Sequence, residues 1–183
     1  MILLVILALV SCVIIWFFTI YNSLVGLKLR ADNAWFQIDV QLKRRYDLIP
    51  NLVEAVKGYM VYEKDTLEWV IKARTQAIDV TGLKDKAQAE NFLTQTLRTL
   101  FAVVERYPEL KANQNVLILQ EELKSTENKI AFARQYYNDE VQCFNTKIQV
   151  VPSNIVANFI GFKEKDFFEI ESTQEREAPK VKL

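Results

Sequence analysis

The sequence predicts an all-α protein, with an N-terminal transmembrane helix followed by an antiparallel four-helix bundle that has one long C-terminal helix. Apolar residues recur every three or four positions along most of the chain, which is the spacing of one helix face. No stretch shows the strict alternation and turn signals of strands. Gly and Pro number only four each among 183 residues, so turns are few. Helices joined by short connections favour an antiparallel bundle.

The N-terminus predicts a membrane anchor over residues 1–22. Residues 2–20 carry no charge, and the first charged side chain is Lys28. As a helix this run spans about 28 Å, close to the roughly 30 Å hydrocarbon core of a bilayer. Aromatic residues gather at its end, as they do at membrane interfaces: Trp16, Phe17, Phe18 and Tyr21.

Two other interpretations of this segment are weaker. A cleaved signal peptide starts with basic residues, and MILLV has none. The sequence Leu9-Val10-Ser11-Cys12 resembles a lipobox, which would make Cys12 a lipidation site. However, VIIWFF follows Cys12 directly, where a lipoprotein turns polar. We therefore expect a retained, unlipidated helix.

The positive charges predict the orientation of the anchor. Lys28, Arg30 and the run Lys43-Arg44-Arg45 follow the apolar segment, and no Lys or Arg precedes it. The positive-inside rule then predicts a single-pass protein of the inner (cytoplasmic) membrane with its C-terminal domain in the cytoplasm.

A helical domain is predicted over residues 23–170, followed by a polar, flexible tail over 171–183. We expect the first helix to continue the anchor as far as Arg45 or Tyr46. Asp47 suits the N-cap of the next helix, and Pro50 is tolerated in a first turn, so these two residues predict a helix corner. The other expected helices run from Pro50 to Val80, from Ala89 to before Pro108, and from about 113 to 150.

Several polar residues fall on or beside the apolar stripes. Such groups pair with one another when buried and fix the register of a bundle. They are therefore candidates for a buried polar network or, alternatively, for a docking surface: Asp39, Arg45, Asn51, Glu54, Glu63, Arg74, Asn128, Arg134 and Asn138.

Composition argues against several kinds of chemistry. The chain has no His, which removes the commonest general base and metal ligand. With only two Cys it lacks a zinc set, and it has no Glu-x-x-His pair for a di-metal site. Lys plus Arg and Asp plus Glu are equal at 23 each, so the chain has no basic excess for nucleic acid. Nucleotide-binding and hydrolase motifs are also missing. We expect no catalytic residues, no metal and no cofactor.

Four stretches resemble the LemA protein family: YNSLVGL (21–27), AWFQIDVQLKRRYDLIPNLVEAVKGY (34–59), YPELKANQNVLILQEELKSTENKIAFARQYYNDEVQCFN (107–145) and VPSNIVANFIGF (151–162). The resemblance implies one N-terminal anchor and an antiparallel helical bundle. It implies no enzymatic residues, and it suggests association with membrane proteases of the HtpX type or other envelope proteins. Family members often have His at the position of Tyr46, and this sequence departs from that pattern.

These observations lead to two functional hypotheses. The first is a non-enzymatic scaffold or adaptor that organises or recruits proteins at the bacterial envelope, alone or as a homo-oligomer. The second is a sensory or ligand-binding bundle with a pocket between helices.

Overall fold

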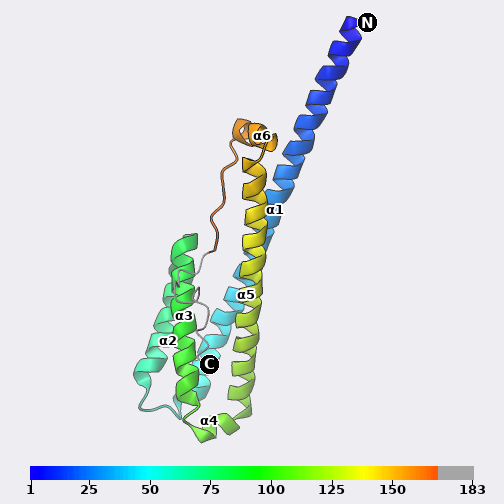
Figure 1. Ribbon diagram of the computed structural model, residues 1–183. Coiled ribbons are helices and arrows are strands. Elements are labelled where there is room, and N and C mark those ends of the chain that lie inside the picture. Colours follow the sequence, from blue (N-terminus) through cyan, green and yellow to red (C-terminus); the bar gives the residue numbers. More distant parts are fainter. Residues whose placement is uncertain (169–183) are drawn as a thin grey trace, which may run out of the picture. The chain divides into compact units, whose positions relative to one another are not determined.

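The computed structural model describes residues 1–168, and these contain helices but no strand (Figure 1). This confirms the all-α prediction, including the long apolar helix at the N-terminus and the long helix near the C-terminus. The helices are α1 (Ile2–Lys57), α2 (Lys64–Asp79), α3 (Leu83–Val104), α4 (Pro108–Ala112), α5 (Gln114–Gln149) and α6 (Ser153–Ile160).

The described chain forms two compact units, and both α1 and α5 contribute to each of them. The first unit contains residues 1–40 and 130–167. The second contains residues 41–129 together with Phe168. The predicted boundary at residue 22 falls inside α1, where the helix has no break, so the division into anchor and bundle stays a prediction. The predicted tail at 171–183 lies outside the described residues.

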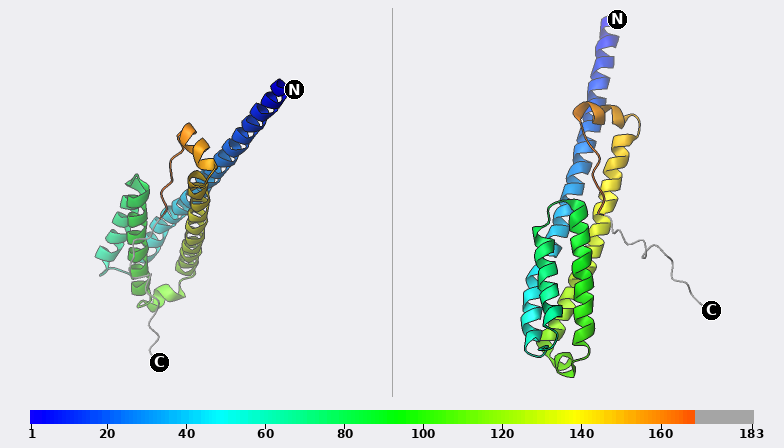
Figure 2. Two further views of the ribbon diagram at one scale, coloured as in Figure 1. Left: turned by 45° about the horizontal axis from the view of Figure 1, so that its top comes forward. Right: turned by 90° about the vertical axis from the view of Figure 1, so that its left-hand side faces the viewer.

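In the first unit, α1 lies beside the C-terminal part of α5, and α6 lies at the end of α5 against α1, whose first turns extend beyond it (Figures 1 and 2). A core cluster joins the three helices: Ile20, Leu24, Phe144, Ile148, Val156 and Ala157. The strap that follows α6 (residues 161–167) returns along α5. Asn145 holds this strap, because its side chain donates to the Lys165 carbonyl and accepts from the Lys165 amide, both at 2.9 Å.

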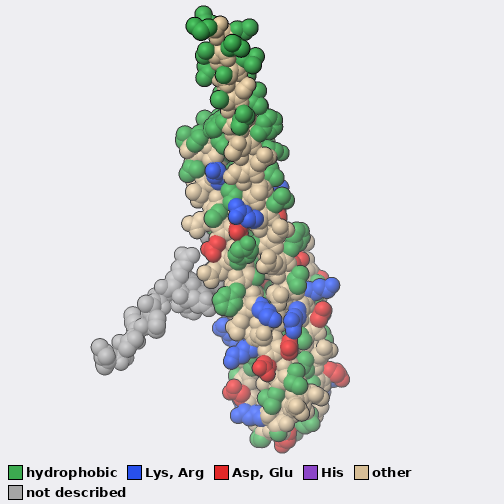
Figure 3. All heavy atoms as spheres, turned by 90° about the vertical axis from the view of Figure 1, so that its right-hand side faces the viewer, with side chains coloured by type: hydrophobic (Ala, Val, Ile, Leu, Met, Phe, Trp, Pro, Cys, Tyr) green, Lys and Arg blue, Asp and Glu red, His purple; other side chains and the backbone are tan. Residues whose placement is uncertain are grey.

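The first turns of α1 are apolar and unburied. The large apolar side chains from Met1 to Val10 are at least half exposed, whereas further along the helix Ile20 and Leu24 are buried. Figure 3 shows apolar side chains over this end of α1 and charged ones only further along. Within the described residues, α1 is the one helix long and apolar enough to cross a membrane.

The second unit is an antiparallel four-helix bundle made of residues 41–57 of α1, helices α2 and α3, and residues 114–129 of α5 (Figure 2). Apolar side chains from all four stretches are buried: Leu42, Ile49, Leu52, Leu67, Val70, Leu93, Leu100, Val116 and Leu123. The Asn113 side chain caps α5, because its Oδ1 accepts the backbone amides of Asn115 and Val116 at 3.0 and 3.3 Å.

The prediction of a helix corner at Asp47 and Pro50 is wrong. α1 continues through both residues to Lys57, and the turn comes at 58–63. A proline inside a helix leaves the carbonyl four residues earlier without its usual N–H donor. Here that carbonyl belongs to Tyr46, and Arg74 Nε of α2 donates to it at 2.6 Å. A donor from the neighbouring helix therefore replaces the bond that Pro50 cannot make.

Candidate functional site: a buried arginine network

Arg45 is the centre of a charged network inside the second unit. Its position on α1 follows the stripe of Ile38 and Leu42, so the helix turns this side chain into the bundle, where it is completely buried. Burial of an unpaired charge is very unfavourable, so a guanidinium at this position requires partners. The main partner is Glu90 of α3, also completely buried, whose Oε2 forms an ion pair with Arg45 Nη2.

The second side of the guanidinium faces α5. Arg45 Nη1 donates to Glu127 Oε2 at 2.6 Å and to Thr94 Oγ1 at 3.1 Å. The Thr94 hydroxyl in turn donates to Glu127 Oε1 at 3.1 Å. The Glu127 side chain is 38% exposed, so this arm of the network reaches the surface of the bundle. One guanidinium on α1 thus ties together carboxylates from α3 and α5.

Tyr46 extends the network towards α2. Its hydroxyl donates a hydrogen bond to Glu90 Oε1 and lies 3.3 Å from the carbonyl of Ala77. Lys86 donates to that same carbonyl at 2.9 Å and places its ammonium 5.5 Å from the centre of the Tyr46 ring. A phenol can donate to a carboxylate while its ring lies beneath a cation. Tyr46 therefore links α1 to the end of α2 and the start of α3.

The arrangement is suited to holding helices in register rather than to chemistry. The guanidinium, the two carboxylates, the threonine and the phenol bond mainly to one another, and the phenol also lies near the Ala77 carbonyl. Directional bonds of this kind cannot be kept if one helix slides against another by a turn. Among the described residues, no group of three or more His, Cys, Asp or Glu side chains could hold a metal ion.

The structure places the predicted polar residues in several different environments. Arg45 and Arg74 are both brought to Tyr46 and its neighbours in the second unit, as described above. Glu63 lies beside Tyr107, where its carboxylate accepts a hydrogen bond and raises the pKa of that phenol. Arg134 is buried in the first unit, and Asn138 is half-buried there. Exposed positions are occupied by Asp39, Asn51, Glu54 and Asn128.

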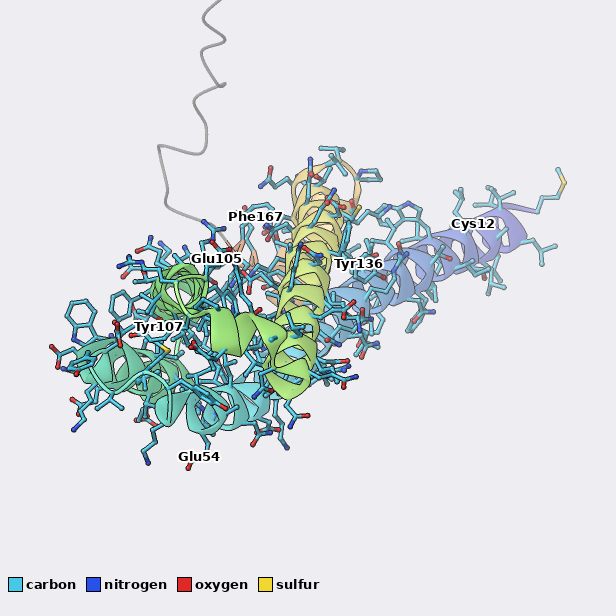
Figure 4. All side chains as sticks on the ribbon, turned by 90° about the horizontal axis from the view of Figure 1, so that it is seen from below. Cys12, Glu54, Glu105, Tyr107, Tyr136 and Phe167 are labelled. Carbon is cyan, nitrogen blue, oxygen red and sulfur yellow. The ribbon has the colours of Figure 1, made fainter. Side chains whose placement is uncertain are left out.

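The exposed members of the set do not join a buried network. Glu54 points outward from α1 (Figure 4) and forms an ion pair of 3.7 Å with Lys57 on the same helix.

The basic run Lys43-Arg44-Arg45 is divided between the surface and the core. Lys43 is exposed and Arg44 pairs with Glu122 at the surface, whereas Arg45 is buried. Cys12 is also exposed, on the apolar part of α1.

Sequence reasoning missed Glu90, Thr94 and Glu127. The signal for Glu90 was present, because it lies three residues before Leu93 and seven before Leu97, on the core face of α3. Glu127 lies four residues after Leu123, at the edge of the α5 stripe. A charged residue at a core position requires an opposite charge on a neighbouring helix, so Glu90 could have been recognised as one candidate partner of a buried cation such as Arg45.

The chain matches known proteins over most of its length. It is 23% identical to magnetosome proteins MamQ 1 and MamQ 2 of Paramagnetospirillum magneticum, over 81% of this chain and 64% of each relative. It is 26% identical to Protein LemA of Metamycoplasma hominis, over 74% of this chain and 63% of that protein. The chain thus spans somewhat less than two thirds of these relatives. None of these names denotes an enzyme.

A family model places these similarities in one group. The LemA family model matches residues 34–183, which include all of the second unit and the part of the first unit formed by α5, α6 and the strap. Together with the apolar N-terminal helix, this match fits a membrane-associated helical protein. The chain belongs to the LemA family.

Proposed function

We propose that this protein is a membrane-anchored helical scaffold or adaptor that organises or recruits proteins at the bacterial envelope, without catalysing a reaction. The observation that carries the proposal is the combination of an apolar helix of membrane-spanning length with a four-helix bundle whose central charges are paired internally. Ion pairs between the helices hold this bundle in one arrangement, which suits a rigid support. Catalysis instead requires reactive side chains that a substrate can reach.

The pairing of the network also bears on the alternative of a ligand-binding bundle. An inter-helix pocket would be lined by polar groups that are free to contact a ligand. The best-placed candidates, Arg45 and Glu90, instead contact each other, and Glu127 and Thr94 complete the set. The scaffold is therefore the function that the geometry supports best.

We propose the inner (cytoplasmic) membrane as the location, with the domain after the anchor in the cytoplasm. The support is the excess of Lys and Arg immediately after the apolar run. The test is a single Cys introduced into the tail of a chain in which Cys12 and Cys143 are replaced by Ser. A membrane-impermeant thiol reagent applied to intact cells should leave this Cys unlabelled, and labelling from outside would reverse the orientation.

The proposed partners are membrane or envelope proteins, with proteases of the HtpX type suggested by the family resemblance, and further copies of the chain. Crosslinking of the full chain in native membranes, followed by mass spectrometry, tests this directly. We expect the same neighbouring proteins, or the same crosslinks between copies, in independent preparations. A strictly monomeric protein without a reproducible neighbour would rule out the scaffold.

A further inference from the structure

The short helix α6 presents an apolar surface that the fold leaves uncovered. Between Lys147 and Lys163 no side chain is charged. Large apolar side chains in this stretch are exposed: Val150, Val151, Ile155, Phe159 and Ile160, with Phe159 80% exposed. A helix end that faces water normally carries polar residues, so this composition indicates a different environment.

One face of α6 is buried against the rest of its unit, and another is exposed. Ser153, Val156 and Ala157 are buried, and the last two join the core cluster with Ile20 and Leu24 of α1. Ile155 and Phe159 are four residues apart, so they lie next to each other on one flank of the helix. The buried face fixes α6 to its unit, and the flank of Ile155 and Phe159 stays free.

The position of α6 along α1 identifies what covers this flank. The ring of Phe159 contacts the ring of Phe17 edge to face, with centroids 6.0 Å apart. Phe17 belongs to the last turn of the apolar run 2–20, whose length of about 28 Å nearly matches the hydrocarbon core. If this run crosses a bilayer, its last turn lies at the membrane face. The contact then brings α6 to the same depth, because both rings belong to one compact unit.

The neighbouring side chains fit a membrane interface as well. Trp16 and Tyr21 flank Phe17, and such aromatic residues are enriched at headgroup level. Lys147 and Lys163 lie at the two ends of the uncharged stretch. At the edge of a membrane-facing surface, their ammonium groups can reach anionic headgroups. Beyond them, Asp32 pairs with Lys165 at 2.6 Å and Arg30 pairs with Glu140 at 3.8 Å, so paired charges start only further from the apolar run.

We propose that α6 is an interfacial helix, whose Ile155 and Phe159 insert into the boundary between headgroups and acyl chains of the membrane that α1 crosses. The lipid bilayer is thus contacted at two places in the sequence, by the apolar run of α1 and by α6. Two contacts on one compact unit limit the tilt and rotation of α1 relative to the membrane, because α6 cannot leave the interface without exposing its apolar flank. This inference rests on the proposed membrane anchor.

Spin-label accessibility in the full chain tests the proposal. In a background with Cys12→Ser and Cys143→Ser, a nitroxide is placed by Phe159→Cys or Ile155→Cys. Two reference labels are placed by Ile6→Cys, an exposed position in the apolar run, and by Gln37→Cys, an exposed position about 25 Å beyond Ile20 along α1. Each labelled protein is reconstituted at low protein-to-lipid ratio into vesicles of phosphatidylcholine and phosphatidylglycerol. Circular dichroism confirms that helix content is unchanged.

Collisions with dissolved oxygen report the acyl region, and collisions with a water-soluble nickel chelate report water. We expect labels at residues 155 and 159 to resemble the label at residue 6, with oxygen collisions several-fold more frequent than nickel collisions. The label at residue 37 should show the opposite ratio. Water-like accessibility at 155 and 159 would overturn the proposal, and so would protection from both reagents, which would mean that protein covers the flank. The label at residue 6 reports the anchor separately, so a failure of α6 insertion is distinguishable from a failure of the anchor.

Discussion

At the scale of single residues, the contrast between Arg45 and its neighbour Arg44 is the most informative. Both are arginines on α1 that pair with glutamates, but the Arg45 and Glu90 side chains are fully buried, whereas Arg44 and Glu122 are 46% and 43% exposed. Loss of one partner from a buried pair leaves an uncompensated charge, while an exposed pair is screened by water. The two arginines should therefore contribute very differently to stability.

We expect Arg45→Met to lower the free energy of unfolding by about 3–5 kcal/mol, because Glu90 is left charged and buried. Arg44→Met is the matched control and should change it by less than about 1 kcal/mol. The measurement is denaturant unfolding of the full chain in detergent micelles, followed by circular dichroism. The double variant Arg45→Met/Glu90→Gln should recover part of the loss. Equal effects of Arg44→Met and Arg45→Met would contradict a buried network.

Tyr137 supplies a pH-dependent test in the first unit. Its hydroxyl donates to the Asp166 carbonyl at 2.9 Å, and its ring contacts Trp35. Burial, together with the nearby carboxylates of Asp166 and Asp32, raises the pKa of Tyr137 above 10.0. The unfolded chain then loses the phenolic proton at a lower pH than the folded chain. Stability must fall as the pH rises from 10.0 towards the raised pKa.

Tyr137→Phe removes the titrating group and should make the loss of stability above pH 10.0 smaller than in the unchanged protein. Tyr59→Phe, the same substitution at an exposed tyrosine, is the variant with which the Tyr137→Phe profile is compared. Thermal unfolding of the full chain at a series of pH values measures both. Profiles that coincide for Tyr137→Phe and the unchanged chain would show that this phenol is not titrating differently in the two states.

At the scale of elements, the continuity of α1 through Pro50 depends on a residue of another helix. Arg74 of α2 donates to the Tyr46 carbonyl that Pro50 leaves without a partner. This hydrogen bond predicts that substitutions of Arg74 and Pro50 do not have additive effects on the free energy of unfolding. In the unchanged chain, Arg74→Met should cost about 1.5–3 kcal/mol, because a bond from a charged donor is lost.

In a Pro50→Ala background, the amide of residue 50 can bond to Tyr46 within the helix, and Arg74→Met should cost clearly less. The double-mutant cycle is measured by denaturant unfolding, with the exposed Lys72→Met on the same helix as control. An identical cost of Arg74→Met in both backgrounds would mean that the arginine acts by other contacts.

The start of α5 offers a simpler test at the same scale. Asn113→Ala removes the acceptor for two free amides and should lower the stability of the second unit by about 1 kcal/mol, whereas Asn113→Ser should retain most of it. Thermal unfolding distinguishes the two substitutions. Equal melting temperatures for both variants would argue against the cap.

The apolar stripes were sufficient for the fold class and for the limits of α5, because a period of 3.6 residues is visible in one sequence. The end of α1 was misplaced by about ten residues, because local rules treat Pro50 as a helix start and cannot register a donor such as Arg74 from a distant segment. Arg45 was recognised as a charge on an apolar face. Its partners come from α3 and α5, and one sequence does not reveal which charges meet across a bundle.

At the scale of the whole molecule, the decisive feature is the apolar run of α1, which we propose crosses a membrane. Both the scaffold and the insertion of α6 require this anchor, whereas the Arg45 network does not. The run carries no charge from residue 2 to residue 20, so charges placed in its middle should abolish spanning. Val10→Lys/Ile14→Lys makes that change at two exposed positions four residues apart, with no effect expected on the buried residues of the second unit.

Alkaline carbonate extraction of membranes from cells that express the full chain is the most direct measurement, because it releases peripheral proteins and retains spanning ones. We expect the unchanged chain to stay in the membrane pellet and Val10→Lys/Ile14→Lys to be recovered in the supernatant. The exposed pair Gln37→Lys/Gln135→Lys, outside the apolar run, should stay in the pellet. Release of the unchanged chain into the supernatant would contradict the anchor.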